Sequence, residues 1–178
     1  MTVYEPLIKA YGQAYYSGLK NLPDILNIET LGLFNPYHGL LELPSEEYPT
    51  IYYALYDIND DGYDECFFTS NVGIEKSAYP GYYDIWTNDG ITSHHLMEGG
   101  YRTSQMVLEN GEILNFGSGG ADFGEYSVYS FQPNGDCTLQ DTYQYDTYNE
   151  DIELEIQDFL EKHPKKDVNF EWIEIPLQ

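Results

Sequence analysis

Side chains that carry oxygen atoms alternate along one short stretch of this chain, from Asp57 to Glu65. The stretch reads Asp-Ile-Asn-Asp-Asp-Gly-Tyr-Asp-Glu, with such side chains at positions 1, 3, 5 and 9 and glycine at position 6. A tightly curled loop of this kind can turn alternate residues inward and supply most of the about six to eight oxygen ligands that Ca²⁺ takes. The spacing therefore predicts a Ca²⁺ site. Its candidate ligands are Asp57, Asn59, Asp61 and Glu65 through their side chains and Tyr63 through its backbone carbonyl.

A simpler interpretation of the same residues needs no metal. Asx-Gly pairs such as Asp61-Gly62 are common in hairpin turns, and the neighbouring acids could be solvated. Five acids lie within residues 57–65, however, and their charges repel one another. A turn that binds no cation would gain from having fewer acids, so we favour the calcium site.

The residues that flank the loop distinguish it from an EF-hand. An EF-hand has a bidentate acid at position 12 and lies between two helices, whereas position 12 here is Phe68. The flanks, residues 51–56 and 66–69, are typical of strands. The loop resembles the strand-loop-strand calcium sites of integrin-type FG-GAP repeats, whose pattern is Asp-x-Asp-x-Asp-Gly-x-x-Asp. This resemblance covers only the loop and its flanks, and it implies a calcium ion held between two strands, with Glu65 in place of the last aspartate.

A wider resemblance is to uncharacterised extracellular lipoprotein domains of Gram-positive bacteria. It rests on a helix with tyrosines from Tyr4 to Tyr15, on the phrase at residues 53–65, and on the strand series that includes residues 115–120. The resemblance implies a cell-surface location and no known activity. We therefore expect an extracellular or cell-surface protein if an export signal has been removed, and a cytoplasmic one otherwise.

The elements that must position the loop are predicted from hydrophobic periodicity and turn residues. Residues 4–19 have apolar side chains at helical spacing, and residues 149–162 repeat this pattern before Pro164. Four prolines between residues 21 and 50 indicate irregular structure. From residue 51, short β-branched and aromatic runs alternate with Asx-Gly turns, which is typical of an antiparallel meander. The expected strands are residues 51–57, 65–71, 82–88, 91–97, 101–109, 112–117, 124–132 and 137–145, and residues 168–175 would add an edge strand.

The predicted fold is α+β, a curled, barrel-like antiparallel meander of about eight strands covered by an N-terminal and a C-terminal helix. With 42% apolar and 16% aromatic residues, the chain can bury a substantial core. We expect one domain over residues 1–178. It would hold a helix and an irregular segment at 1–50, the meander at 51–146, and the second helix with a tail at 147–178.

The charge of the chain limits its partners. It has 31 acids against 7 bases, a formal charge of −24, which repels phosphate backbones, so we expect no nucleic-acid ligand. No stretch approaches the length of a membrane span, so we expect no direct membrane insertion. The charge also supports an alternative function, an acidic intracellular protein that binds and inhibits a basic, nucleic-acid-binding protein partner. The oligomeric state stays open.

The sequence carries no catalytic motif, so we expect a binding module rather than an enzyme. His94 and His95 are adjacent in a predicted strand and point to opposite faces. Residues 117–120 are rich in glycine but lack the Lys-Ser/Thr of a phosphate-binding loop. A hydrolase with paired carboxylates is a third class, for which the many acids allow no choice of residues. Arg102, the only arginine, is expected to pair with an acid or stack on a ring.

Two cysteines, Cys66 and Cys137, could form one disulfide bridge. Cys66 lies in an apolar run, which favours a small buried hydrophobic side chain instead. The cysteines therefore leave the redox compartment open.

Overall fold

The computed structural model describes residues 2–20, 22–27, 31–34, 49–71, 82–100, 102–120, 122–148 and 150–176. The described helices are α1 (Glu5–Tyr16) and α3 (Ile152–Lys162), with a 3₁₀ turn, η2 (Gly32–Phe34), after α1. The described strands are β1 (Ile51–Tyr56), β2 (Glu65–Ser70), β3 (Asp84–Asn88), β4 (Ser93–Glu98), β5 (Thr103–Val107), β6 (Ile113–Ser118), β7 (Phe123–Phe131), β8 (Cys137–Asp146) and β9 (Ile173–Glu174). Most of the segment predicted as irregular, residues 21–50, lies outside the described residues.

The strands form two antiparallel sheets. The first sheet has the order β4-β3-β2-β1-β9 and the second has the order β5-β6-β7-β8. All eight strands of the predicted meander are present, and the predicted edge strand is β9, which pairs with β1. The α+β fold with antiparallel strands is thus confirmed. The curled, barrel-like arrangement is not, because the described strands divide between two sheets and close no barrel.

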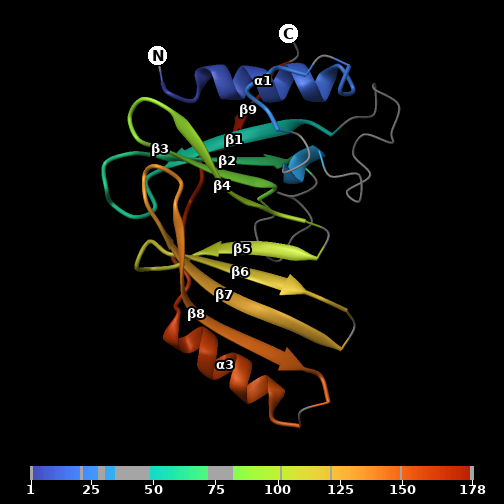
Figure 1. Cartoon of the computed structure of the whole chain (residues 1–178), viewed down its shortest axis with the longest axis vertical. Helices are drawn as coiled ribbons and strands as arrows, with labels where there is room; N and C mark the ends of the chain where they lie inside the picture. Colours follow the sequence, from blue (N-terminus) through green and yellow to red (C-terminus); the bar gives the residue numbers. More distant parts are fainter. Residues whose placement is uncertain are drawn as a thin grey trace.

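Three hydrophobic clusters stack the elements into layers in the order α1, first sheet, second sheet, α3 (Figure 1). Alternate side chains of β2 show why the first sheet is covered on both faces. Cys66 and Phe68 belong to the cluster under α1, whereas Phe67 belongs to the cluster between the sheets. The last cluster joins Phe159 of α3 to Leu114 and other residues of the second sheet. The two predicted helices therefore cover outer faces, one on each sheet.

Helix α1 is held on the first sheet by aromatic packing. The ring of Tyr11 stacks on Phe68 with 3.8 Å between centroids, and its hydroxyl accepts a hydrogen bond from Trp86 Nε1 at 3.0 Å. The helix begins and ends within the predicted residues 4–19, and Pro6 stands in its first turn, where no intrahelical N–H bond is lost. A buried tyrosine satisfies its hydroxyl in this way while its ring contributes apolar area.

The four predicted Asx-Gly turns all have glycine in the left-handed region. The φ angles are +90° at Gly62, +85° at Gly90, +81° at Gly111 and +87° at Gly135. These turns separate strands as the sequence indicated, because glycine adopts positive φ without a steric cost. Gly111 has a second constraint, since a Cβ placed on it would lie 2.6 Å from Cα of Asn59 in the loop between β1 and β2.

This close approach predicts different costs for two alanine substitutions. Gly62→Ala should lose about 1 to 2 kcal/mol from its positive φ alone, because nothing lies within 4 Å of the added Cβ. Gly111→Ala combines the same backbone strain with a backbone clash and should be destabilised further. Urea unfolding of both variants in EDTA measures the difference. Equal losses would mean that the β5–β6 turn does not press on the loop.

Two further features follow from the described residues. Cys66 is buried and Cys137 is exposed, and both are free thiols, so the possible bridge is not formed.

No helix in the described part of the chain is long and apolar enough to cross a membrane.

Candidate functional site

The predicted calcium loop connects β1 to β2 at the edge of the space between the two sheets. It is tightly curled, because Asp60 has φ +59° and Gly62 has φ +90°. Asparagine and aspartate tolerate the left-handed region better than other non-glycine residues, which suits an aspartate to this place. The flanking residues pair across β1 and β2, with Tyr56 opposite Glu65, so the loop is closed by a strand ladder as expected.

Three of the predicted ligands gather within the loop. The carboxylate of Asp57 accepts hydrogen bonds from the backbone N–H groups of Asp61 at 3.2 Å and Gly62 at 2.9 Å. Asp61 accepts one from the N–H of Tyr63 at 2.9 Å. Asn59 donates to the Asp61 carboxylate at 3.1 Å and accepts from the Asp61 N–H at 3.2 Å. The side chains of positions 1, 3 and 5 thus fold back over the loop backbone.

Glu65 has other hydrogen-bond partners than these three side chains. It is fully buried, and its carboxylate accepts hydrogen bonds from the Ile58 N–H at 3.1 Å and from the Thr87 hydroxyl at 3.0 Å. Burial raises the pKa of Glu65 to about 7, and the nearby charges of Asp61 and Asp57 also raise it. The two hydrogen bonds oppose this rise. Glu65 therefore connects the loop to β3 through its hydrogen bond with Thr87.

The donor set suits a hard cation. A carboxylate oxygen that accepts one hydrogen bond keeps a second lone pair, so Asp57 and Asp61 can still act as ligands. Within the described residues, no three side chains of His, Cys, Asp or Glu converge closely enough to hold a metal ion. A cation in this loop would therefore also need the amide oxygen of Asn59 and backbone carbonyls such as that of Tyr63. These are oxygen ligands of the kind that Ca²⁺ accepts.

The loop is also fixed from the outside by the C-terminal segment. Lys166 donates from Nζ to the carbonyl of Ile58 at 3.1 Å, and the same ammonium lies 5.4 Å from the centre of the Tyr56 ring. A β-bridge between Leu108 and Lys165 holds this segment on the second sheet. A positive charge beside five acids of the loop offsets part of their repulsion.

A second buried carboxylate, Asp84 on β3, was not anticipated from the sequence. Its Oδ1 accepts a hydrogen bond from the N–H of Gly32 at 2.7 Å, and its Oδ2 accepts one from the N–H of Leu33 at 3.1 Å. Nε2 of His95 lies 3.3 Å from Oδ1, and the His95 ring packs 5.0 Å from that of Trp86. Burial raises the pKa of Asp84, whereas His95 and the two N–H groups lower it. Asp84 therefore joins η2 to the first sheet.

The remaining polar candidates have separate surroundings. His94 lies 3.3 Å from Asp89, so the two adjacent histidines contact different carboxylates and share no site. Arg102 is exposed and forms no ion pair or ring contact with any residue that the structure describes, so neither its expected acidic partner nor its expected aromatic partner is seen there. Residues 117–119 of the glycine-rich segment border a groove at the far end of the second sheet, which the sequence did not indicate.

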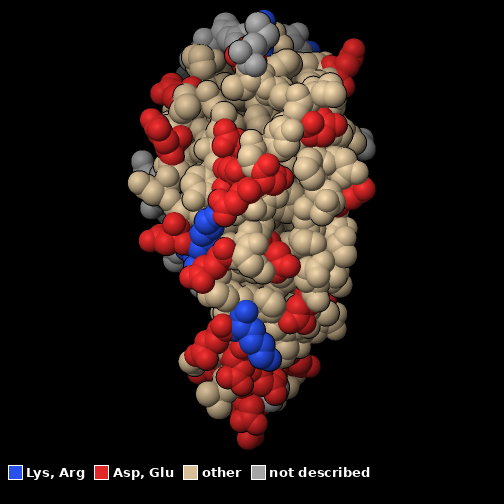
Figure 2. Space-filling model, turned by 90° about the vertical axis from the view of Figure 1, so that its left-hand side faces the viewer, with Lys and Arg blue, Asp and Glu red and all other residues tan. Residues whose placement is uncertain are grey.

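Acidic side chains dominate the surface around these sites. Figure 2 shows them over the full length of one face, with basic side chains at only a few points. They are dense at the end of the molecule where α3 lies in Figure 1. Such a surface attracts cations and repels anions over a distance of about one Debye length, about 8 to 10 Å at physiological salt.

Comparisons with protein-family models, with curated proteins and with solved structures gave no match for this chain.

Proposed function

We propose that this chain is a calcium-binding module of an exported or cell-surface protein, and that the loop at residues 57–65 holds Ca²⁺ as a structural element. The observation that carries the proposal is the gathering of Asp57, Asn59 and Asp61 over one curled turn. Two of these three residues are acids. The cost of collecting such charges is recovered when a divalent cation lies among them.

The position of the loop supports a structural role. It is pinned by Glu65 to Thr87, by Lys166 to the C-terminal segment, and by contact with Gly111. A cation bound in the loop would stabilise the place where the loop contacts both sheets and the C-terminal segment. Helix opening, as in calcium sensors, has no counterpart here because strands flank the loop.

An extracellular setting is part of the proposal. Calcium sites of extracellular modules commonly have Kd values of about 10⁻⁴ to 10⁻³ M. A short loop that is exposed to solvent from Asp60 to Asp64 suits this weak range better than the tight range of intracellular calcium buffers. The resemblance to Gram-positive cell-surface domains also supports an extracellular setting.

The melting temperature in calcium tests the proposal. A ligand that binds only the folded protein stabilises it by RT ln(1 + [L]/Kd), which is about 2.7 kcal/mol at a hundredfold excess over Kd. We expect millimolar CaCl₂ to raise the melting temperature of the protein relative to EDTA. Calorimetry in calcium, magnesium and EDTA gives the shift directly. An unchanged melting curve in calcium would falsify the proposal.

A pair of matched variants locates the effect. Asp61→Asn removes a charge from the Asp61-Gly62 turn in the loop, and Asp89→Asn removes one from the Asp89-Gly90 turn between β3 and β4. Asp89 also accepts backbone hydrogen bonds within its turn, from the N–H groups of Ile91 and Thr92. We expect Asp61→Asn to lose most of the calcium shift and Asp89→Asn to keep it. The same calcium shift in both variants would place any bound calcium elsewhere.

A further inference from the structure

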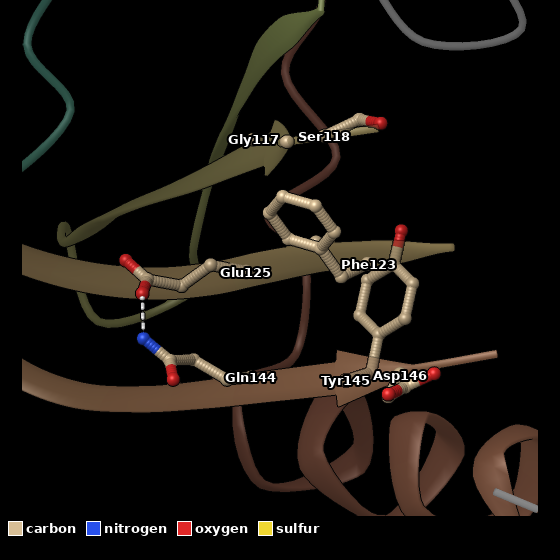
Figure 3. Close-up of a pocket in the computed structure, with 9 residues that line it drawn as sticks. Gly117, Ser118, Phe123, Glu125, Gln144, Tyr145 and Asp146 are labelled. Atoms are coloured by element: carbon tan, nitrogen blue, oxygen red, sulfur yellow. Dashed lines mark hydrogen bonds between the residues drawn. The ribbon is translucent and has the colours of Figure 1, made fainter. Parts of the chain in front are cut away.

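A groove lies at the open end of the second sheet, where β6 ends, β7 begins and β8 ends (Figure 3). Its volume is about 630 Å³, which is within the range of small-molecule sites. The calcium loop is elsewhere, because it contacts Gly111 before the start of β6, whereas the groove borders Ser118 at the end of that strand. The lining residues are Gly117, Ser118, Gly119, Phe123, Gly124, Glu125, Gln144, Tyr145 and Asp146.

Two aromatic rings lie directly on glycine backbone in this groove. The ring of Phe123 lies so close to Gly119 that a Cβ there would overlap it. A Cβ on Gly124 would lie 2.5 Å from the hydroxyl oxygen of Tyr145. The absence of side chains at the glycines thus makes room for the rings, and Phe123 remains 57% exposed. Figure 3 shows the two rings rising from the neighbouring strands β7 and β8.

The polar groups of the groove are chiefly hydrogen-bond acceptors. Glu125 accepts from the Ser127 hydroxyl and from Gln144 Nε2, each at 2.6 Å, and these two donors lower the pKa of Glu125. Asp146 accepts from the backbone N–H of Tyr148 at 2.9 Å. Each carboxylate keeps free lone pairs. The Oε1 atom of Gln144 is a further acceptor, since its Nε2 is directed to Glu125.

Basic side chains are missing from this lining. No Lys, Arg or His belongs to the described residues around the groove, and Arg102 lines a separate hollow with Ser118 and Phe116. The two carboxylates of the groove therefore have no cationic partner among the residues described there. A bound anion would meet two negative charges and the field of a chain with net charge −24. A bound cation with donor groups would satisfy both acids.

We propose that the groove binds a small organic cation. Its ammonium or guanidinium group would face Glu125 and Asp146, and its apolar part would lie on the ring of Phe123. Aromatic rings attract cations through their negative faces, and carboxylates form charge-assisted hydrogen bonds with N–H donors. The cross-strand register brings these parts together on one face of the sheet, since Phe123 is opposite Asp146 and Glu125 is opposite Gln144. Tyr145 lies on the other face, where its ring is near those of Phe116 and Tyr126. The proposal does not depend on the calcium loop.

Two probes that differ in charge but share shape test the proposal. Phenylguanidinium chloride and phenylurea both carry a phenyl ring and a planar head group with N–H donors, and only the first is a cation. Isothermal titration calorimetry in EDTA should show that phenylguanidinium binds at least about tenfold more tightly, with an affinity that falls as salt is added. Backbone amide resonances of Gly119 and Gly124 should shift most in ¹H–¹⁵N spectra.

Matched variants assign the binding to the groove. Phe123→Leu keeps an apolar side chain but removes the ring, and Glu125→Gln removes a charge while keeping an amide that can bond Ser127 and Gln144. Each should weaken phenylguanidinium binding by at least about fivefold. Leu139→Ala and Glu109→Gln change an exposed apolar side chain and an acid outside the groove, and should bind as the wild type does. Amide spectra establish that each variant is folded.

Several results would overturn the proposal. Phenylurea that binds as tightly as phenylguanidinium would show that charge is not recognised. A neutral sugar that shifts Gly119 and Gly124 when the cation does not would assign the groove to an uncharged ligand. Wild-type affinity in both Phe123→Leu and Glu125→Gln, or no binding of phenylguanidinium at millimolar concentration, would each rule out the cation site.

Discussion

The Asp84→Ala variant is expected to lose about 3 to 5 kcal/mol of its free energy of unfolding. Asp84 is fully buried and accepts hydrogen bonds from the N–H groups of Gly32 and Leu33. Alanine would leave both backbone donors, and Nε2 of His95, without this buried acceptor. A buried donor left unpaired costs about 1 to 3 kcal/mol, and Asp84 is the acceptor for two such backbone donors. Urea or guanidinium unfolding measures the loss.

The same hairpin contains a matched control for this substitution. Asp89 also accepts two backbone N–H bonds, from Ile91 and Thr92, and also lies 3.3 Å from a histidine, His94. The difference is exposure, because the Asp89 side chain is 38% exposed and that of Asp84 is not exposed at all. Water can replace the lost acceptor at Asp89, so Asp89→Ala should be far less destabilised. Similar losses in the two variants would show that burial does not decide the strength of these bonds.

Glu65 is expected to make the calcium-free protein less stable as the pH rises. Its pKa is raised from an ordinary value of 4.5 to about 7, mainly by burial. One pKa unit corresponds to about 1.4 kcal/mol, so ionisation of this one carboxyl should cost about 3 kcal/mol of the free energy of unfolding. The measurement is urea unfolding in EDTA at pH values from 4 to 8.

The direction of this pH effect follows from proton binding. Between about pH 4.5 and pH 7 the native protein holds a proton on Glu65 that the unfolded chain has released, so a rise in pH favours unfolding. Below pH 4.5 both states are protonated, and above pH 7 both are ionised. The stabilisation is therefore present at low pH and lost as the pH rises through about 7. Asp84, whose pKa is also raised, adds an effect of the same sign.

Glu65→Gln isolates the contribution of this residue. Its amide oxygen can accept from the Ile58 N–H and its amide nitrogen can donate to the Thr87 hydroxyl, so the buried bonds are kept. The free energy of unfolding of this variant should change less with pH than that of the wild type over the window from 4.5 to 7. Glu125→Gln serves as the control, because the pKa of Glu125 is lowered and its effect lies at lower pH. Parallel wild-type and Glu65→Gln curves would contradict the assignment.

The calcium proposal adds a consequence for the same experiment. A divalent cation close to Glu65 favours the ionised carboxylate, so it would offset the loss at higher pH. The stabilisation by calcium should therefore increase from pH 5 to pH 8. A calcium shift that does not vary with pH would place the bound ion away from Glu65.

The turns, helices and strands were predictable because each depends on residues that are close together in the sequence. The glycines of the four Asx-Gly turns each take positive φ, and this requirement can be read from the dipeptide itself. Both helices also begin and end within a few residues of their apolar patterns. Strand positions follow from these turns, so the meander needed no information about distant contacts.

The division of the strands into two sheets could not be predicted, because it depends on a contact between distant parts of the chain. The chain leaves the first sheet at Gly99, whose N–H donates to the carbonyl of Tyr83 at 2.7 Å. A Cβ on Gly99 would overlap the carbonyl oxygen of Tyr82. In the sequence, Gly99-Gly100 has the composition of an ordinary hairpin turn, so one continuous meander was the natural expectation.

The candidate site was only partly predictable for the same reason. Asp57, Asn59 and Asp61 gather through bonds within a few residues, and their spacing indicated this. The surroundings of Glu65 depend on Thr87, which is 22 positions away, and those of Asp84 on η2, more than 50 positions away. An acid in a strand is normally interpreted as a solvent-facing residue. Only the folded structure reveals that these two are buried.

The pairing of β9 with β1 bears on how the chain avoids aggregation while it is being made. The edge of β1 stays open until residues 173 and 174 have been synthesised, and Ile175 then donates to Ile51 and accepts from the hydroxyl of Tyr16, a bond that spans 159 positions. Before that point the free N–H and C=O groups of β1 are available to strands of other chains. A strand of two residues thus shields the edge of the first sheet from intermolecular pairing once it has formed.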